Sequence, residues 1–241
     1  MIVLFTDFGW NGPYVGQLHA ALALAAPDER VIDLMHDVSR HAVRAAAYLL
    51  PSLVEAFPKD TVFLCVVDPG VGSERRAVAM RADDRWYVGP DNGLFQIVEQ
   101  RAARVECHEI LWRPPHLSTS FHGRDLFAPV AAALSKGKLP ESRLLTPTSR
   151  QAATWPDCLA EVIYIDAFGN AMTGLLAERA DKRCTLLVHG RDLAYATTFS
   201  AVAHGYAFWY CNSSGLVEIA VNQGSAADLL GLRVGDPLEL R

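Results

Sequence analysis

The chain has 241 residues, of which 51% are hydrophobic and 20% are charged, and its formal net charge at pH 7 is −5. These values are typical of a globular protein with one large domain or two modest ones. The negative net charge argues against a nucleic-acid-binding protein, because such proteins carry a basic surface.

The first half of the sequence alternates short apolar segments with Ala-rich segments. In chain order, the pattern predicts a strand at 2–5, a helix at 14–26, a strand at 31–34, a helix at 42–57, a strand at 61–67, a hairpin of 77–81 with 85–88, and helices from Leu94 and over 127–134. Pro51 is expected to kink or break the helix at 42–57. Strands that alternate with helices indicate an α/β domain with a mainly parallel sheet flanked by helices, which we assign to residues 1–145.

A composition change separates this half from the rest of the chain. Prolines, serines and threonines become frequent after Lys136, and we place a linker at 146–156. Beyond the linker, short strands are predicted at 160–165, 184–188, 207–211, 216–221 and 237–240, with helical signal only at 226–230. Short strands joined by turns indicate a smaller C-terminal β-barrel domain, which we assign to residues 157–241.

The N-terminal sequence and the cysteines do not favour an exported protein. The N-terminus lacks the basic start and apolar stretch of a signal peptide, and no apolar run is long enough to span a membrane. The five cysteines are scattered and form no CxxC pair. These features predict a cytoplasmic protein with reduced thiols and no metal site.

Three predicted strands run into a turn that contains an aspartate, namely Asp7, Asp68 and Asp166. Aspartate favours turns for local reasons, so each of the three taken alone is well explained as a turn residue. Together they lie beside glycines at the edge of the fold where α/β proteins bind ligands. Their combination favours a binding site.

The loop from Asp68 to Arg76 is the densest of these turns. Its glycines allow close approach of a ligand, and Arg75 can neutralise or orient a carboxylate. A solvated salt bridge of little energetic value is the alternative. The loop lacks the lysine and the spacing of a phosphate-binding loop, which excludes that function.

Two other turns offer groups suited to chemistry or recognition. His122 lies in a Gly-containing turn before a predicted helix, where it either bonds locally or titrates beside a reacting water. The segment from Asp166 to Asn170 combines a carboxylate, an aromatic ring and an amide, which together can recognise a purine. The segment from Asn212 to Gly215 reads as an ordinary turn.

Eight segments, in order along nearly the whole chain, match the pattern of one protein family. They are Thr6–Gly9, His36–Val38, Ala45–Leu50, Val66–Gly72, Val88–Leu94, Phe121–Asp125, Asp166–Asn170 and Asn212–Gly215. On these motifs the chain resembles the S-adenosylmethionine hydroxide adenosyltransferases, which are related to fluorinating and chlorinating enzymes. The resemblance implies hydrolysis of S-adenosylmethionine to adenosine and methionine, without a cofactor.

The resemblance also implies an assembly and a set of site residues. It implies a homotrimer with the sites between subunits and a small-molecule substrate. Asp68, Arg75 and His122 would position and activate a water molecule. The substrate-binding residues implied are Asp7 for the ribose, Phe168 and Phe199 beside the adenine, Asn170 and the Val221 backbone at the adenine edge, Asp166 and Ser213 at the methionine portion, and Phe8 and Asn92 in the matching turns.

Two other functions stay open from the sequence. A sensor could bind adenosine or S-adenosylmethionine without turnover, although it would not need a complete water-activating trio. A halogenating enzyme is disfavoured, because a carboxylate beside the nucleophile would repel a halide ion. One departure from the family pattern is Gly12, which stands where the family has an acid near the substrate's amino group.

Overall fold

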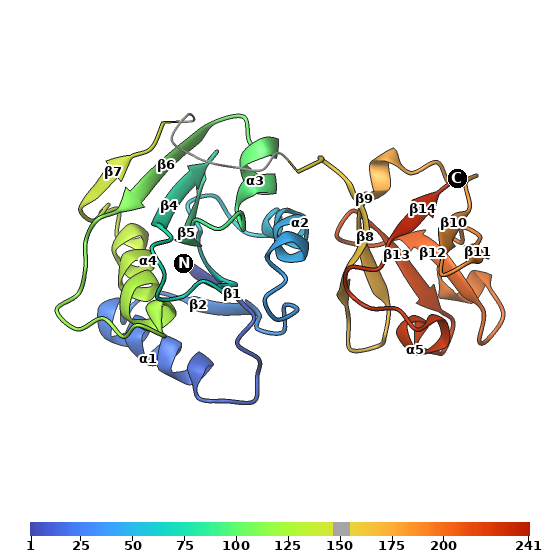
Figure 1. Cartoon of the computed structure of the whole chain (residues 1–241), viewed down its shortest axis with the longest axis horizontal. Helices are drawn as coiled ribbons and strands as arrows, with labels where there is room; N and C mark the ends of the chain where they lie inside the picture. Colours follow the sequence, from blue (N-terminus) through green and yellow to red (C-terminus); the bar gives the residue numbers. More distant parts are fainter. Residues whose placement is uncertain (147–154) are drawn as a thin grey trace. The chain divides into compact units, whose positions relative to one another are not determined.

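The computed structural model describes residues 1–146 and 155–241 (Figure 1). The chain divides into two compact units. The first comprises residues 1–47 and 56–155, and the second comprises 48–55 and 156–241. Most of the linker predicted at 146–156, namely residues 147–154, lies outside the described residues.

The first unit contains a seven-stranded sheet with strand order β2-β1-β3-β5-β4-β6-β7. Its strands are β1 (Ile2–Thr6), β2 (Val31–Met35), β3 (Val62–Val66), β4 (Ala77–Ala82), β5 (Arg85–Pro90), β6 (Val105–Ile110) and β7 (Ser142–Leu144). The pairs β1–β2, β1–β3 and β3–β5 are parallel, whereas β4–β5, β4–β6 and β6–β7 are antiparallel. The sheet is therefore mixed rather than mainly parallel. The hairpin after β3 reverses the chain direction, and the strands that follow it pair antiparallel.

Helices flank this sheet on both sides (Figure 1). They are α1 (Tyr14–Ala25), α2 (Val43–Val54), α3 (Gln96–Arg101) and α4 (Ala128–Ser135), with a π-helical turn at Gly123–Phe127 directly before α4. Helices α1 and α4 pack against each other, and α4 also contacts β1, β3 and β5. Helix α2 runs through Pro51 without a break. Buried neighbours such as Leu49 and Leu50 hold the helix despite the hydrogen bond that proline removes.

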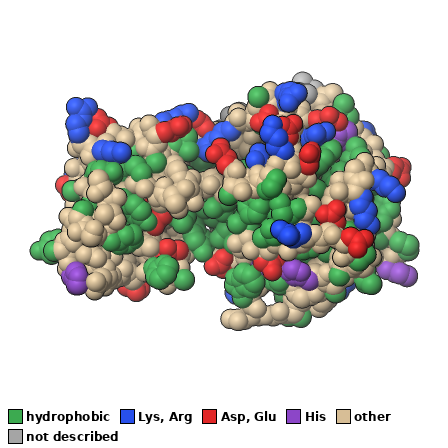
Figure 2. Space-filling view, turned by 180° about the vertical axis from the view of Figure 1, so that it is seen from behind, with side chains coloured by type: hydrophobic (Ala, Val, Ile, Leu, Met, Phe, Trp, Pro, Cys, Tyr) green, Lys and Arg blue, Asp and Glu red, His purple; other side chains and the backbone are tan. Residues whose placement is uncertain are grey.

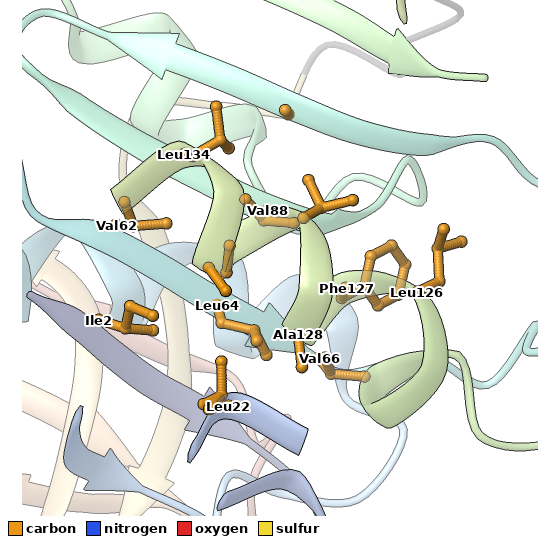
Figure 3. Packing of buried hydrophobic residues seen from close by; sticks show 14 of the residues in the cluster. Ile2, Leu22, Val62, Leu64, Val66, Val88, Leu126, Phe127, Ala128 and Leu134 are labelled. Atoms are coloured by element: carbon orange, nitrogen blue, oxygen red, sulfur yellow. The ribbon is translucent and has the colours of Figure 1, made fainter. Parts of the chain in front are cut away.

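The main core of the first unit lies between the sheet and helices α1 and α4 (Figure 3). Ile2 and Leu4 of β1 face Leu18 and Leu22 of α1, and all four side chains are fully buried. Alternate residues of a strand point to opposite faces, so the apolar run of β1 serves both faces of a covered sheet. This packing holds the carboxyl ends of β1 and β3, from which Asp7 and Asp68 follow.

The second unit consists mostly of β-structure. A four-stranded antiparallel sheet has the order β12-β13-β9-β8, and a three-stranded sheet has the order β11-β10-β14. The strands are β8 (Leu159–Ile165), β9 (Ala171–Leu176), β10 (Leu186–Val188), β11 (Arg191–Leu193), β12 (Ala207–Cys211), β13 (Leu216–Val221) and β14 (Leu238–Leu240), with helix α5 at Ala226–Leu230 and single 3₁₀ turns at Ala177–Arg179 and Phe199–Ala201. Two sheets are present in the described residues, and no closed barrel is found among them.

Charged side chains of both signs are interspersed on the face seen in Figure 2. No helix within residues 1–146 and 155–241 has both the length and the apolar character needed to cross a bilayer. The same residues contain no cluster of three or more histidine, cysteine or acidic side chains arranged to hold a metal ion.

Candidate active site

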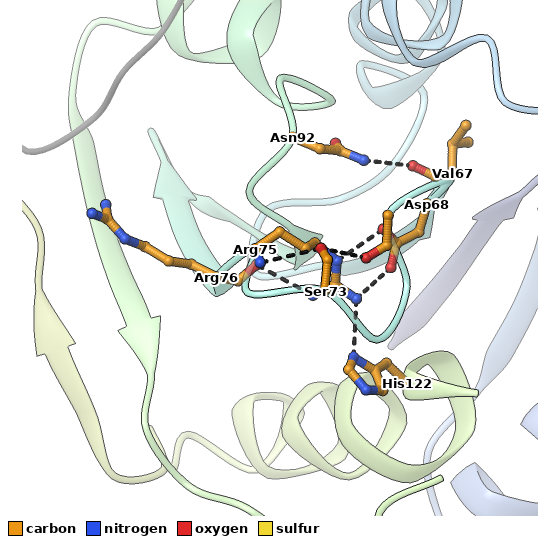
Figure 4. Close-up of polar contacts among 8 residues, drawn as sticks. Val67, Asp68, Ser73, Arg75, Arg76, Asn92 and His122 are labelled. Atoms are coloured by element: carbon orange, nitrogen blue, oxygen red, sulfur yellow. Dashed lines mark hydrogen bonds and ion pairs between the residues drawn. The ribbon is translucent and has the colours of Figure 1, made fainter. Parts of the chain in front are cut away.

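A buried ion pair follows the carboxyl end of β3. Asp68 comes two residues after this strand, and Arg75 returns to it from the end of the same loop. Arg75 Nε donates to Asp68 Oδ1 at 2.8 Å, and Arg75 Nη2 donates to Asp68 Oδ2 (Figure 4). The two side chains are only 9% and 4% exposed. A bidentate pair of this kind fixes the direction in which the carboxylate points.

His122 contacts the same guanidinium from another loop. Arg75 Nη2 lies 3.0 Å from His122 Nδ1. Arginine can only donate hydrogen bonds, so Nδ1 must accept, and the proton of the neutral imidazole then lies on Nε2. Burial lowers the pKa of His122 below its ordinary value, and the positive charge of Arg75 lowers it further. His122 is therefore neutral at pH 7.

A glycine allows the two loops of this cluster to approach each other. Gly72 has a φ of +81°, and a Cβ atom built on it would lie 2.5 Å from the carbonyl oxygen of Thr119. Thr119 lies three residues before His122. The absence of a side chain at Gly72 thus lets the Asp68 loop meet the His122 loop.

Asn92 supports the start of the Asp68 loop from the turn after β5. Its Nδ2 donates to the carbonyl oxygen of Val67 at 2.8 Å (Figure 4). Its Oδ1 accepts from the Leu94 N–H at 3.2 Å. Both ends of the amide are engaged within the protein. This arrangement fixes the backbone directly before Asp68.

The carboxyl end of β1 lies beside that of β3, because these strands are paired in parallel. Asp7 Oδ2 accepts a hydrogen bond from the His41 N–H at 3.1 Å. The Phe8 ring packs edge-on against Phe121, with centroids 5.7 Å apart, and Phe121 directly precedes His122. Residues from three turns of the first unit are thus gathered at one edge of its sheet.

A chain of hydrogen bonds holds the turn that carries Asp7. The Thr6 hydroxyl lies 2.7 Å from Nδ1 of His36, which is fully buried, and His36 Nε2 lies 2.9 Å from Asp33 Oδ1. Because the carboxylate can only accept, Nε2 donates to it, and in the tautomer with the proton on Nε2 the Nδ1 atom accepts from the Thr6 hydroxyl. Thr6 Oγ1 in turn accepts from the Phe8 N–H at 3.3 Å.

The second unit contains a pocket of about 700 Å³. Its lining includes all six residues of this unit that the sequence singled out for substrate binding: Asp166, Phe168, Asn170, Phe199, Ser213 and Val221. Phe168 is 80% exposed, which is unusual for a large aromatic side chain. These residues come from the turn after β8, a 3₁₀ turn, the turn after β12 and the end of β13, and they gather around one pocket.

Asp166 is engaged by its own turn. Its Oδ1 accepts from the backbone N–H groups of Phe168 at 2.9 Å and Asn170 at 2.8 Å, and its Oδ2 accepts from Asn170 Nδ2 at 2.9 Å. Asn170 Oδ1 is buried and has no hydrogen-bond partner among the described residues. A buried acceptor without a partner is costly, so this atom is suited to a donor on a ligand.

The sequence analysis missed half of the residues that line this pocket. They are Met172, Tyr210, Asn212, Glu218, Gln223 and Gly224. The sequence contained a signal for one of them, Glu218. It interrupts the otherwise apolar run of β13, and an acid is rarely buried unless it has a partner. Tyr210 and Met172 could not be found from the sequence, since their role depends on the strand register.

Comparison with known proteins identifies the family of this chain. The model of the SAM hydroxide adenosyltransferase N-terminal domain matches residues 2–143, and that of the C-terminal domain matches residues 160–239. The chain therefore belongs to the SAM hydroxide adenosyltransferase family, which confirms the resemblance seen in the sequence.

Individual relatives align over nearly their full length. A protein of Thermus thermophilus named (R)-S-adenosyl-L-methionine hydrolase is 40% identical, over 99% of this chain and 98% of the relative. A protein of the same name from Salinispora arenicola is 39% identical, over 98% and 95%. Among solved structures, an uncharacterized conserved protein from Thermotoga maritima has a TM-score of 0.88 and 32% identity, covering 100% of this chain and 99% of the other.

Proposed function

We propose that this chain hydrolyses S-adenosylmethionine to adenosine and methionine, by attack of a water molecule on C5′ of the ribose. The observation that carries the proposal is the contact of Asp68, Arg75 and His122 in one partly buried cluster. A protein that only binds its ligand has no need of a carboxylate and an imidazole held by one guanidinium. Full-length relatives named (R)-S-adenosyl-L-methionine hydrolase support the same reaction.

The sulfonium group of the substrate reduces what the enzyme must supply for the reaction. Methionine leaves as a neutral thioether, so no acid is needed to expel it. The C5′–S bond breaks with its electron pair passing to sulfur, the C5′–O bond forms, and the water loses one proton. The enzyme has to hold the water in line with the C5′–S bond and accept that proton. This chemistry calls for no cofactor.

We assign the proton acceptor to Asp68. Nδ1 of His122 is occupied by Arg75, and the remaining nitrogen of the neutral ring carries a proton. His122 can therefore orient the water by donating from Nε2, whereas Asp68 retains free lone pairs. A carboxylate is a sufficient base here, because the water oxygen becomes acidic as its bond to carbon forms.

The remaining site residues other than Asn92 are assigned to substrate contacts. Asp7 and Phe8 would serve the ribose side from the turn after β1, and Asn92 would hold the turn of Asp68. In the second unit, Phe168 and Phe199 would flank the adenine, Asn170 and the Val221 backbone would contact its edge, and Asp166 and Ser213 would serve the methionine portion. Support comes from the shared pocket and from the unpartnered Asn170 Oδ1, which suits an N–H donor of a purine.

The names of the relatives specify the R form of the substrate. The sulfonium sulfur is a stereocentre because it carries three different substituents and a lone pair. We extend the preference for the R epimer to this chain. Separate assays of the two epimers test this part of the proposal, and equal rates would contradict it.

Several broader features complete the proposal. The enzyme would act in the cytoplasm as a homotrimer with the sites between subunits, and its domains would comprise residues 1–145 and 157–241. The five cysteines are free thiols, as expected for a reducing compartment. Closure of the second domain into a barrel is supported by two isolated bridges, Glu161 to Pro237 and Tyr195 to Trp209, which link the two sheets.

The decisive experiment is incubation of the purified protein with S-adenosylmethionine in ¹⁸O-labelled water, followed by mass spectrometry. Adenosine that carries the label at its 5′ oxygen, with an equal amount of methionine, is the expected product. Binding of S-adenosylmethionine without labelled product would contradict hydrolysis and indicate a sensor. A halogenated nucleoside formed in the presence of chloride or fluoride would contradict it as well.

A further inference from the structure

Glu218 occupies an unusual position for an acidic residue. It lies in β13, the second strand of the four-stranded sheet, and it is only 2% exposed. Its neighbours Val217 and Ile219 point into the main core of the second unit, so Glu218 points to the opposite face. On that face it pairs in register with Tyr210 of β12 and Met172 of β9, which line the pocket together with it.

The carboxylate of Glu218 joins two walls of the pocket. Its Oε1 accepts from the Tyr210 hydroxyl at 2.7 Å, and its Oε2 accepts from Asn212 Nδ2 at 2.6 Å. The Tyr210 ring packs against Phe199, with centroids 5.5 Å apart. Asn212 Oδ1 accepts from the Ser214 N–H at 2.9 Å and so holds the turn that presents Ser213.

These two hydrogen bonds orient the carboxylate but do not neutralise it. In the described part of the chain, the partners of the Glu218 carboxylate are Tyr210 and Asn212, neither of them lysine or arginine, and the described lining of the pocket contains neither of these cations. The lining does contain a second acid, Asp166. Burial raises the pKa of Glu218 above its ordinary value, against the effect of its two hydrogen bonds, and the charge of Asp166 adds to the rise.

A second feature of the pocket is independent of this acid. Asn170 is 5% exposed, lines the same pocket, and has the unpartnered Oδ1 described above. Within residues 1–146 and 155–241, the pocket thus combines a buried acid that lacks a counter-charge with a buried acceptor that lacks a donor. Both deficits are removed by a ligand that carries positive charge and N–H groups.

We propose that Glu218 is a specificity-determining residue, whose buried carboxylate makes this pocket select a positively charged nucleoside over the neutral nucleoside. This inference rests on the proposed function, since S-adenosylmethionine carries a sulfonium and an ammonium group, whereas the product adenosine carries neither. The carboxylate therefore favours the substrate over the nucleoside product and promotes release of adenosine after the reaction.

The test compares equilibrium binding of three unreactive ligands to the full-length protein by isothermal titration calorimetry. Sinefungin carries an amine at the sulfonium position and an ammonium group, S-adenosylhomocysteine carries only the ammonium group, and adenosine is neutral. We expect Glu218→Gln to weaken sinefungin binding by tenfold or more and adenosine binding by less than twofold. Glu218→Asp should restore part of the preference, because it retains the charge.

Two further variants separate selection by the Glu218 charge from a general change in the structure of the pocket. Glu239→Gln removes one negative charge from an exposed position of β14 and should leave all three affinities unchanged. Tyr210→Phe keeps the carboxylate and the ring but removes a hydrogen bond that stabilises the ionised form. It should weaken sinefungin more than adenosine, and it keeps the test valid if Glu218→Gln does not fold.

The outcomes distinguish the two proposals. Equal weakening of sinefungin and adenosine by Glu218→Gln, or no weakening of either, would overturn the role of Glu218 alone. Failure of the wild-type protein to bind any of the three ligands would contradict the proposed function. Weakening of sinefungin but not S-adenosylhomocysteine would assign the contact to the sulfonium position, and weakening of both would assign it to the ammonium group.

Discussion

Arg75 contacts both other members of the cluster at the end of β3, and its donors orient the Asp68 carboxylate and set the tautomer of His122. Its bidentate contact orients Asp68, and its contact with Nδ1 places the proton of neutral His122 on Nε2. The roles of the two residues therefore differ although both face the same guanidinium. In the proposed mechanism, Asp68 accepts a proton, whereas His122 positions the water.

Asp68→Asn tests the role of the base. We expect the turnover rate to fall by about 10²–10⁴-fold, which is the usual contribution of general base catalysis. Adenosine binding, measured by calorimetry, should change by less than about twofold if Asp68 acts on the water and not on the nucleoside. The Arg75 charge is left buried and unpaired, so the free energy of unfolding should also fall by about 3 kcal/mol. Loss of adenosine binding in a folded variant would assign Asp68 to ligand binding instead.

The pH dependence of kcat/KM tests the state of His122. The pKa of His122 in the folded protein is lowered, so the neutral form persists to a lower pH than in a free histidine. The midpoint of the acidic fall in activity should therefore lie below pH 6.5, the ordinary histidine value. His122→Gln should lower the rate and remove this acidic limb, whereas His116→Gln, in the loop before it, should keep the limb. An unchanged limb in His122→Gln would exclude His122 as its source.

At the scale of elements, two features hold the site: the contact of the Asp68 loop with the His122 loop at Gly72, and the turn after β1. Gly72→Ala tests this contact between the two loops. It adds a Cβ at a position with a φ of +81°, and that Cβ would lie 2.5 Å from the carbonyl oxygen of Thr119. We expect a stability loss of more than about 1–2 kcal/mol, the usual cost of the left-handed backbone, together with a marked fall in kcat. Gly137→Ala is the matched control, since Gly137 has a φ of +73° and no atom within 4 Å of its added Cβ. Equal activity loss in both variants would contradict a specific role for Gly72.

His36→Phe tests the hydrogen-bond chain behind the turn of Asp7. The substitution leaves the buried Thr6 hydroxyl without its partner, so unfolding free energy should fall by about 1–3 kcal/mol. Because His36 acts on the position of Asp7, KM should rise more than kcat falls. His19→Gln removes the more exposed contact to Asp33, and stability should change by less than about 0.5 kcal/mol. A fall in kcat at constant KM would place the effect of His36 elsewhere.

Much of the first unit could be predicted from sequence, because its segments have strong and simple patterns. The strands that became β1 and β3 are continuous apolar runs that end in turn residues, and the helix at Tyr14–Ala25 is Ala-rich and ends before Pro27. Strand β6 was not predicted, since charged residues break its apolar pattern. The prediction of a mainly parallel sheet was wrong as a consequence. Without β6, nothing in the sequence indicated that β6 and β7 extend the sheet by antiparallel pairing beyond the hairpin.

Prediction was weaker in the second unit, where pairing partners are distant in the sequence. Strand β9 contains Gly174 and few β-branched residues, so its local sequence gives little strand signal. Asp166, Phe168, Asn170 and Ser213 were predicted in turns, which have recognisable composition, whereas Phe199 and Val221 were implied only by the family resemblance. Tyr210, Met172 and Glu218 line the pocket only through the register of three strands, and register is not visible in a single sequence.

At the scale of the whole molecule, the proposed trimer can be tested by subunit mixing. One variant, Asp68→Asn, is defective in the first unit. The other carries both Phe168→Ala and Asn170→Ala and is defective in the second unit. If sites form between subunits, mixed trimers contain some sites with both parts intact, and activity should recover to about a quarter of the wild-type value for random mixing. Co-expression with two affinity tags and native mass spectrometry would establish that mixed trimers are present. Activity no higher than that of the separate variants would exclude sites of this kind.

The seven-stranded sheet ends in a strand of only three residues, β7. Its middle residue, Arg143, is exposed and forms an ion pair with Glu109 of the neighbouring strand. Exposed backbone groups at a sheet edge can template the addition of a strand from another molecule, which leads to aggregation. A short edge that carries a charged side chain offers few hydrogen bonds to an incoming strand. The β7 edge therefore disfavours amyloid-like association through this end of the sheet.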